Sequence, residues 1–261
     1  MNSASLIATL ALVRDTFREA FARRIFWGFF VCSSLFLFAL AFIFRIDFSA
    51  GPPMVHSFQG TLAVAIYYVG TALSVFASAS LVSVMFEPGR IELLLSKPVS
   101  RTHLLLGRYL GNLAVVAANV SYLTGGAWLI FGLKTGVWGG GFLLSALCMI
   151  FVFAVLLAVI VLAAVVLDSA VVATMITFGI LFAAAILAQR FSIERLLSSE
   201  SSRQLVELLY YVLPKTSDIS GIVWKLSVQE PVESWMPVWS SGLFGAAVLA
   251  AGIRHFQKRS F

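Results

Sequence analysis

Charged residues are scarce in this 261-residue chain: they make up 11% of it, whereas hydrophobic residues make up 60%. In a typical soluble domain about a quarter of the residues are charged. The mean hydropathy, +0.97, also lies far above the range of soluble domains. This composition excludes an ordinary soluble domain. It predicts an all-α, polytopic membrane protein that is surrounded by the lipid bilayer and has no nucleic-acid partner.

The motifs of several kinds of catalytic site are also missing. No Gly-Lys pair occurs, so none of the five lysines completes a G-x-x-x-x-G-K-[ST] loop, which cradles nucleotide phosphates. His56, His103 and His255 are far apart and have no metal-ligand spacing. Cys32 and Cys148 lie within apolar runs and indicate neither a disulfide nor a metal site. We therefore expect no catalytic residue, no metal and no cofactor bound by this chain.

Long apolar stretches are what the sequence has instead. A helix needs ~20 apolar residues to cross a hydrocarbon core of ~30 Å. Five stretches meet this length, at 25–44, 60–85, 109–131, 142–167 and 170–189, and the 16-residue stretch 238–253 is predicted as the sixth span. The fourth and fifth stretches are separated only by Asp168-Ser169. The chain must fold back there, because one helix over 142–189 would be ~70 Å long at ~1.5 Å per residue. We expect either side chain to cap the fifth span.

Polar positions within the predicted spans are few. Asp, Glu, His and Arg are absent from all six, which counts against a proton- or ion-coupled carrier. The third span is the most polar, and its candidate pathway-lining residues are Asn112, Asn119, Tyr122 and Thr124. These side chains need partners in neighbouring helices or a hydrated cavity, and both alternatives stay open. In the second span, Gly70, Ser74 and Ser78 form a small-residue face that another helix could approach closely.

Segments outside the spans also have helical patterns. Residues 1–24 have apolar positions three or four apart among charged ones, which predicts an amphipathic helix in the inner interface. Loops are expected at 45–59 and 132–141. The outer segment 190–237 is the largest polar stretch of the chain.

Within that outer segment, Ser201-x-x-Gln204 is a capping-box pattern, and the apolar stripe that follows is ended by Pro214. We expect this helix to lie on the membrane surface. A second short helix is predicted at 219–226. The tryptophans expected to anchor this region at the interface are Trp224, Trp235 and Trp239.

The distribution of charge predicts the orientation of the chain. With six spans and the N-terminus inside, the inner segments hold 11 of the 18 basic residues and 5 of the 12 acidic ones. The outer segments then hold 7 of each, so the whole net charge of +6 lies on the inner side. This satisfies the positive-inside rule. We expect a multi-pass protein of the cell (inner) membrane with both termini in the cytoplasm.

Charge, turn residues and helical signals come together at 86–108, which reads F-E-P-G-R-I-E-L-L-L-S-K-P-V-S-R-T-H-L-L-L-G-R. Pro88-Gly89 ends the preceding apolar helix, and Pro98 ends a short helix after it. Ser100 is a good N-cap for the next helix. The pattern predicts a short cytoplasmic helix lying crosswise between the second and third spans.

This stretch resembles the coupling region of the type-2 ABC exporter permeases (the ABC-2 type permease family). In that family an acidic residue and a Gly-x-Ile-Glu-Leu-Leu-Leu-Ser run are followed by Pro-Val-Ser-Arg and a Gly-Arg/Lys pair. The matching positions are Glu87, Gly89, Ile91, Glu92, Leu93, Leu94, Leu95, Ser96, Pro98, Val99, Ser100, Arg101, Gly107 and Arg108. One departure is Arg90, where many relatives carry Thr.

The resemblance implies a single six-span permease domain over 1–261, without enzymatic activity of its own. Two such subunits, expected here as a homodimer, form the export pathway in that family, and separate cytoplasmic ABC ATPase subunits bind ATP and Mg and drive it. The resemblance also implies that the crosswise helix at 91–95 docks in a groove of the ATPase, and that the ATPase-coupling residues lie within 87–101. Glu92 and Arg101 are the charged candidates for this contact, and Leu93, Leu94 and Leu95 supply its apolar side.

Other functions remain open from the sequence. The stretch 86–108 could be an ordinary cytoplasmic loop with basic residues near the lipid headgroups. The whole chain could be a membrane scaffold that recruits a partner through its outer segment, and copurification of a dependent ATPase would argue against that. It could also be a neutral secondary carrier, which would function in liposomes without ATP.

Overall fold

The computed structural model describes Arg14, Arg18 and residues 24–43, 51–83 and 100–258. Every regular element in this part of the chain is helical, which confirms the predicted all-α class. In chain order the elements are α2 (Arg24–Phe38), the π-helix η1 (Ala39–Ile43), α3 (Pro52–Ser83), α5 (Arg101–Thr135), α6 (Gly140–Leu167), α7 (Ala170–Leu187), α8 (Arg190–Leu196), α9 (Glu200–Val212), α10 (Thr216–Ser227) and α11 (Met236–Lys258). The predicted amphipathic helix over 1–24 and the predicted crosswise helix within 86–99 lie outside the described residues, apart from Arg14, Arg18 and Arg24.

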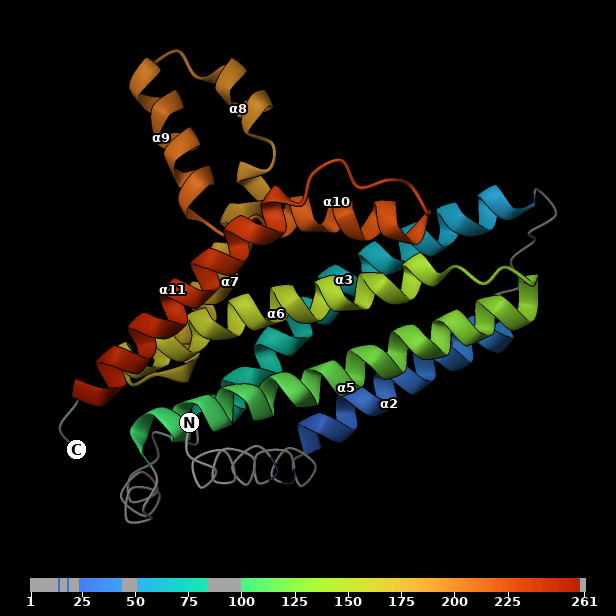
Figure 1. Ribbon diagram of the computed structural model, residues 1–261, viewed down its shortest axis with the longest axis horizontal. Coiled ribbons are helices and arrows are strands. Elements are labelled where there is room, and N and C mark those ends of the chain that lie inside the picture. Colours follow the sequence, from blue (N-terminus) through green and yellow to red (C-terminus); the bar gives the residue numbers. More distant parts are fainter. Residues whose placement is uncertain (1–13, 15–17, 19–23, 44–50, 84–99, 259–261) are drawn as a thin grey trace.

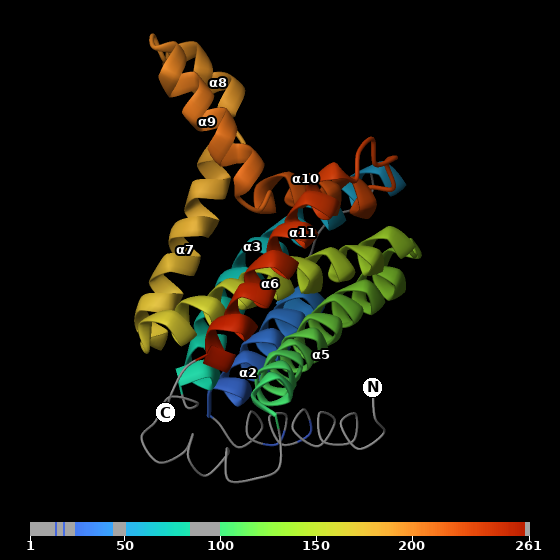
Figure 2. The same ribbon diagram turned by 60° about the vertical axis from the view of Figure 1, so that its left-hand side comes forward.

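Helix α6 lies at the centre of the bundle and packs against α3, α5, α7, α10 and α11 (Figures 1 and 2). Its sequence has no charge from Gly140 to Leu167, and buried residues occur all around it. Leu156, Leu157 and Ile160 are fully buried. A helix that is apolar on every side is stable only when other helices or lipid surround it, so the composition of α6 explains its central position.

Four helices, α3, α5, α6 and α11, are long and apolar enough to cross a membrane. The number rises to five if α7 and α8, which are bent by 72° across a short break, form one span. The described apolar helix Trp27–Phe42 is shorter than the usual span. The chain is thus a membrane protein with several spans, whereas only part of the predicted count of six is reproduced.

The predicted loops at 45–59 and 132–141 are too long. Helix α3 already begins at Pro52, because a proline ring fixes the φ angle that the first helical residue needs. Helix α5 continues to Thr135, where Gly136 ends it in a left-handed conformation with φ +71°. The connection to α6 is therefore confined to 136–139. Glycines within 132–141 indicated a loop, but several of them lie inside helices.

The corner between α6 and α7 follows the prediction. Asp168 ends α6 in the left-handed region, with φ 54°. Ser169 is the N-cap of α7, and its hydroxyl accepts a hydrogen bond from Val172 N at 3.3 Å. The fold-back at Asp168-Ser169 is confirmed, with the serine as the capping side chain.

The outer segment folds into three helices rather than two. Helices α8 and α9 form a hairpin that extends sideways from the bundle, crosswise to α5 and α6, in both views (Figures 1 and 2). Helix α9 ends before Pro214, as predicted, but its N-cap is Ser199, so the capping box expected at Ser201 is wrong. The Ser199 side chain makes no capping hydrogen bond, and Arg203 holds this end instead by donating to the Leu197 carbonyl at 2.9 and 3.1 Å.

Helix α10 includes the predicted 219–226 and packs against α3 and α6. Tyr67 of α3 donates its hydroxyl to the Thr216 carbonyl at 2.5 Å. At the other end, a Cβ atom added to Gly141 would overlap the Leu226 carbonyl oxygen. Trp224 is half-buried, and its ring lies against Gly60 of α3, so it contributes to the packing of α10 on α3. Trp235 and Trp239 are exposed, as an anchoring role requires.

A cluster of charged and aromatic residues holds the base of the hairpin to α10. The Arg190 guanidinium lies 3.7 Å from the centre of the Tyr210 ring, and the Lys215 ammonium lies 4.7 Å from it. Tyr210 donates its hydroxyl to Asp218 at 2.7 Å. Burial, with a contribution from Asp218, raises the pKa of Tyr210 to about 12, so the phenol stays a neutral donor at ordinary pH. The hairpin is therefore tied to the bundle at its base.

Candidate functional site

The predicted ATPase-coupling residues fall mostly outside the described part of the chain. Those that do are Glu87, Gly89, Ile91, Glu92, Leu93, Leu94, Leu95, Ser96 and Pro98. Ser100 and Arg101 are described, and they form the beginning of α5. The contacts of these two residues show how the end of the stretch 86–108 joins the helical bundle.

Ser100 is the N-cap of α5, as the sequence predicted. Its backbone is extended, with φ −66° and ψ 148°, and its hydroxyl accepts a hydrogen bond from His103 N at 3.4 Å. The same hydroxyl contacts His103 Nδ1. A serine cap satisfies one of the free N–H groups of the first turn, so it fixes where the helix starts relative to the preceding segment.

The start of α5 is hydrogen-bonded to the end of α11. Arg101 donates from Nη1 to the Gln257 carbonyl at 3.4 Å, and Gln257 donates from Nε2 to Thr102 Oγ1 at 2.7 Å. These two contacts join positions that are 155 or 156 residues apart in the sequence. In Figure 1 the two helix ends lie close together at the lower left of the bundle. Any displacement of Arg101 would therefore also act on the end of α11.

Separating these two helix ends should cost a measurable amount of stability. Thr102→Val and Gln257→Ala each remove the 2.7 Å hydrogen bond, and a typical net contribution is about 0.5–1.5 kcal/mol. A double-mutant cycle on thermal unfolding in detergent should give a coupling energy of about 0.5–1 kcal/mol. Arg254→Ala in place of Gln257→Ala is the control, since Arg254 is exposed on the same helix. Additive effects of Thr102→Val and Gln257→Ala would show that the contact is not formed.

Two of the predicted pathway-lining residues of α5 pair with serines of α2. Ser33 donates to Asn119 Oδ1 at 3.3 Å, and Ser34 shares a hydrogen bond of 3.0 Å with the Tyr122 hydroxyl. These contacts are interhelical hydrogen bonds, one of the two alternatives left open by the sequence. Sequence reasoning missed Ser33, because a serine in an apolar run gives no sign of the helix that it faces.

Asn112 and Thr124 are buried in a different way. Asn112 is 2% exposed and Thr124 is fully buried, yet Asn112 Oδ1 and Thr124 Oγ1 have no hydrogen-bond partner within the described part of the protein. Asn112 lies one turn after Arg108, which is 7% exposed despite its charge. A buried polar atom without a partner costs about 1–3 kcal/mol, so these positions favour an enclosed water molecule. Their part in a transport pathway stays a prediction.

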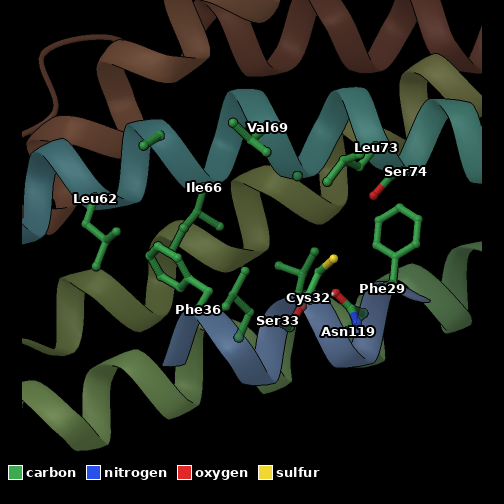
Figure 3. A pocket seen from close by; sticks show the side chains of 14 residues that line it. Phe29, Cys32, Ser33, Phe36, Leu62, Ile66, Val69, Leu73, Ser74 and Asn119 are labelled. Atoms are coloured by element: carbon green, nitrogen blue, oxygen red, sulfur yellow. Dashed lines mark hydrogen bonds between the residues drawn. The ribbon is translucent and has the colours of Figure 1, made fainter. Parts of the chain in front are cut away.

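A cavity of about 210 Å³ lies between α2, α3 and α5 (Figure 3). Asn119 and Ser33 are at its wall, together with Ser74 and Gly70 of α3. Most of the other side chains around it are aliphatic or aromatic. The four predicted lining residues thus do not converge: Asn119 reaches this cavity, whereas Asn112, Tyr122 and Thr124 are not among the residues that line it.

No cluster of three or more His, Cys, Asp or Glu residues with metal-ligand geometry occurs within the described ranges. Within the segment 190–237, Lys225 Nζ and Glu233 Oε1 form a salt bridge 2.7 Å long. The hydrogen bond from Lys225 lowers the pKa of Glu233. Both groups are accessible to solvent, and they support the loop after α10 rather than a reactive site.

Comparison with known proteins bears on the whole of this arrangement. No curated protein matches the chain. The family model described as "ABC-2 family transporter protein" matches residues 10–261, which include the stretch 86–108, the polar face of α5 and the outer helices. Because that match covers nearly the whole sequence, the chain belongs to the ABC-2 family of transporter proteins.

Proposed function

We propose that the chain is the membrane-spanning permease subunit of an ATP-driven export system. The observation that carries this proposal is the family match over 10–261 in a chain whose sequence contains no phosphate-binding loop. The transport subunit of an ATP-driven system that lacks such a loop must receive its energy from another protein. The family implies that this partner is an ABC ATPase, which binds ATP and Mg, and the permease contributes no catalytic residue.

The coupling stretch 86–108 is the proposed contact with that ATPase. Its Leu93-Leu94-Leu95 run needs a protein or lipid cover at a water-facing surface. The stretch leads directly into α5, whose first turn is capped by Ser100 and hydrogen-bonded to α11 through Arg101 and Gln257. These contacts support transmission of a movement from the ATPase to two helices of the bundle at once.

The pathway is proposed to form between two copies of the chain. A single subunit offers few polar positions within its predicted spans. The homodimer is the simplest assembly that gives a complete pathway. A complex with one permease copy, one ATPase and full transport activity would contradict it.

Six spans remain the proposed topology. Helix α2 and η1 together extend over 20 residues, from Arg24 to Ile43, which is the length that a ~30 Å hydrocarbon core needs. Helix α7 has 18 residues and contains no charge. With α3, α5, α6 and α11, these two segments give six crossings, so both termini lie on the same side of the membrane. We place that side in the cytoplasm and the protein in the cell (inner) membrane.

Copurification tests the function directly. The tagged chain, extracted from its native membrane in mild detergent, should retain an ABC ATPase. In liposomes the hydrolysis rate of that ATPase should depend on the permease. Transport by the chain alone without ATP would identify a neutral carrier instead, and an ATPase whose rate ignores the permease would favour a scaffold.

Labelling from the two sides of the membrane tests the orientation. Single cysteines replace Ser199, at the N-cap of α9, or Ser96, in the coupling stretch, in a background without Cys32 and Cys148. The charge distribution predicts that an impermeant thiol reagent labels position 199 from outside intact cells and position 96 only after the cells are opened. Labelling of both positions from outside would refute this topology.

A further inference from the structure

Helix α9 has an apolar stripe that the other described helices leave largely open. Leu205, Leu208, Leu209 and Val212 are three or four residues apart, so they lie along one face of the helix. Their exposed fractions lie between 40% and 59%. Such a stripe is unfavourable in water, so lipid or another protein surface must cover it.

The opposite face of α9 is charged. Glu200, Arg203 and Glu207 are three or four residues apart on that face, and all three are exposed. The hairpin over 190–212 holds three arginines and three glutamates, so its net charge is zero. A helix with one apolar and one charged face is typical of the boundary between lipid headgroups and acyl chains. Without a net charge, the hairpin has no electrostatic preference for anionic over zwitterionic lipid.

The length of α7 places the hairpin near such a boundary. Helix α7 has 18 residues and no charge, which gives about 27 Å at ~1.5 Å per residue, close to a hydrocarbon core of ~30 Å. Helix α8 follows with Arg190, Glu194 and Arg195 among its seven residues, and hydrocarbon disfavours these charges. The bend of 72° between α7 and α8 turns the chain away from the axis of the span at this point.

A hydrogen bond to α11 fixes the other end of the hairpin at a similar level. Lys215, two residues after the C-cap of α9 at Leu213, donates its backbone N–H to Ser241 Oγ at 2.9 Å. Trp239, two residues before Ser241 on α11, is 75% exposed. Exposed tryptophans are enriched where a span meets the headgroups. Both ends of the hairpin therefore lie where spans leave the hydrocarbon.

We propose that the apolar stripe of α9 is buried among the acyl chains of the leaflet on its own side of the membrane, so that the hairpin is a lipid-anchored arm beside the spans. In the proposed topology this is the outer leaflet. The sequence predicted only that the helix lies on the membrane surface, whereas the structure identifies the face that enters the lipid. The inference rests on the proposed crossing of the membrane by α7 and does not depend on an ATPase.

A second copy of the chain is a less suitable cover for the stripe. A stable protein interface typically takes about 20–30 residues from each side. The stripe offers four side chains, on a hairpin that extends sideways from the bundle (Figures 1 and 2). Lipid, in contrast, needs no complementary shape and is present on all sides of the spans.

Spin labels on α9 test which medium surrounds each face. The full chain, in a background without Cys32 and Cys148, carries a single nitroxide-labelled cysteine at one position of α9 and is placed in phosphatidylcholine nanodiscs. Power saturation then measures collisions of the label with oxygen, which concentrates in lipid, and with a neutral nickel chelate, which stays in water. A label at the exposed Gln229 is the water reference, and a chain-labelled phosphatidylcholine is the lipid reference.

Labels at 205, 208 and 212 should collide more with oxygen than with nickel, as the lipid reference does. Labels at 203 and 207 should show the reverse, so the sign of the logarithm of the collision ratio alternates with the helical period. Replacing part of the phosphatidylcholine by phosphatidylglycerol should leave all five ratios unchanged, because the hairpin has no net charge.

The variant Leu205→Ser/Leu208→Ser, read by a label at 212, tests whether the stripe holds α9 in the lipid. Each lost leucine should shift the equilibrium between lipid-buried and water-exposed label by about tenfold toward water. Glu207→Ser is the matched control on the opposite face and should leave the label at 212 in lipid. Both variants should retain the ATPase as the wild type does, because the hairpin and the coupling stretch are separate segments.

Two results would overturn the proposal. Collisions dominated by nickel at all five positions would show that α9 stands free in water. Low collision rates with both reagents at 205, 208 and 212, with dipolar broadening between labels, would show that a second copy covers the stripe. Labelling of a cysteine at position 199 only from the inner side would contradict the outer leaflet. Failure to copurify an ATPase would refute the proposed transport function and leave the collision ratios as they are.

Discussion

Replacing Glu92 by Arg is expected to abolish retention of the ATPase while the protein still inserts and accumulates normally in the membrane. The position lies in the Glu-Leu-Leu-Leu-Ser run of the coupling stretch, outside the predicted spans. Reversing one member of a charge pair at an interface leaves the partner charge unpaired or facing a like charge. Such a loss typically costs roughly 2–5 kcal/mol, about 30- to several-thousand-fold in the association constant.

Arg101→Glu should have a similar effect on ATPase retention, but its interpretation needs a second variant. Arg101 also donates a hydrogen bond to the Gln257 carbonyl at the end of α11. Gln257→Ala removes the neighbouring contact to Thr102 without changing a charge in the coupling stretch. If Arg101 acts through the ATPase interface, Arg101→Glu loses the ATPase and Gln257→Ala keeps it.

Glu200→Arg is the matched charge reversal for this experiment. Glu200 begins α9 in the outer segment, where its side chain is largely exposed and 3.9 Å from Arg203. Exposed pairs of this kind contribute little, so this variant should retain the ATPase at the wild-type level. Wild-type association and turnover in both Glu92→Arg and Arg101→Glu would mean that 86–108 is only an interfacial loop, and the proposed contact of this stretch with the ATPase would be refuted.

Much of the fold could be predicted because the bilayer limits the choices. An uncharged run of this length must be helical in lipid, and Asp168-Ser169 is the only break in 142–189. The helix ends were less predictable. Pro52 and Gly132 were assigned to loops from residue type, yet Pro52 is a suitable first helical residue and Gly132 is packed inside α5, where Trp138 contacts the position of its missing side chain.

The packing of the outer segment could not be predicted from local pattern. A short helix at 219–226 was expected, but its pattern did not indicate a partner, whereas α10 buries Ile219 and Val223 and packs against α3 and α6. Similarly, the polar residues of the third span were recognised, whereas the Ser33 that pairs with Asn119 was not. Periodicity shows that a face is apolar or polar, but it does not tell which distant helix meets that face.

Gly141 is where this outer packing is tightest, and Gly141→Ala is expected to destabilise the protein strongly. An added Cβ atom would overlap the carbonyl oxygen of Leu226, near the end of α10. Overpacking at a buried site typically costs about 1–3 kcal/mol, and a rigid backbone atom gives less relief than a movable side chain. At about 2–4 °C per kcal/mol for a chain of this size, the melting temperature in detergent should fall by about 2–12 °C.

Gly140→Ala is the control that isolates this contact. Both glycines lie in the first turn of α6, and a Cβ atom on Gly140 meets nothing within 4 Å. Alanine is a better helix former than glycine by up to ~1 kcal/mol, so Gly140→Ala should be neutral or stabilising, and Gly141→Ala should be destabilising in spite of the same gain. Because α10 and the coupling stretch belong to different segments, Gly141→Ala should still retain the ATPase below its melting temperature, unlike Glu92→Arg. Equal stability of the two alanine variants would show that α10 does not pack on α6 at Gly141.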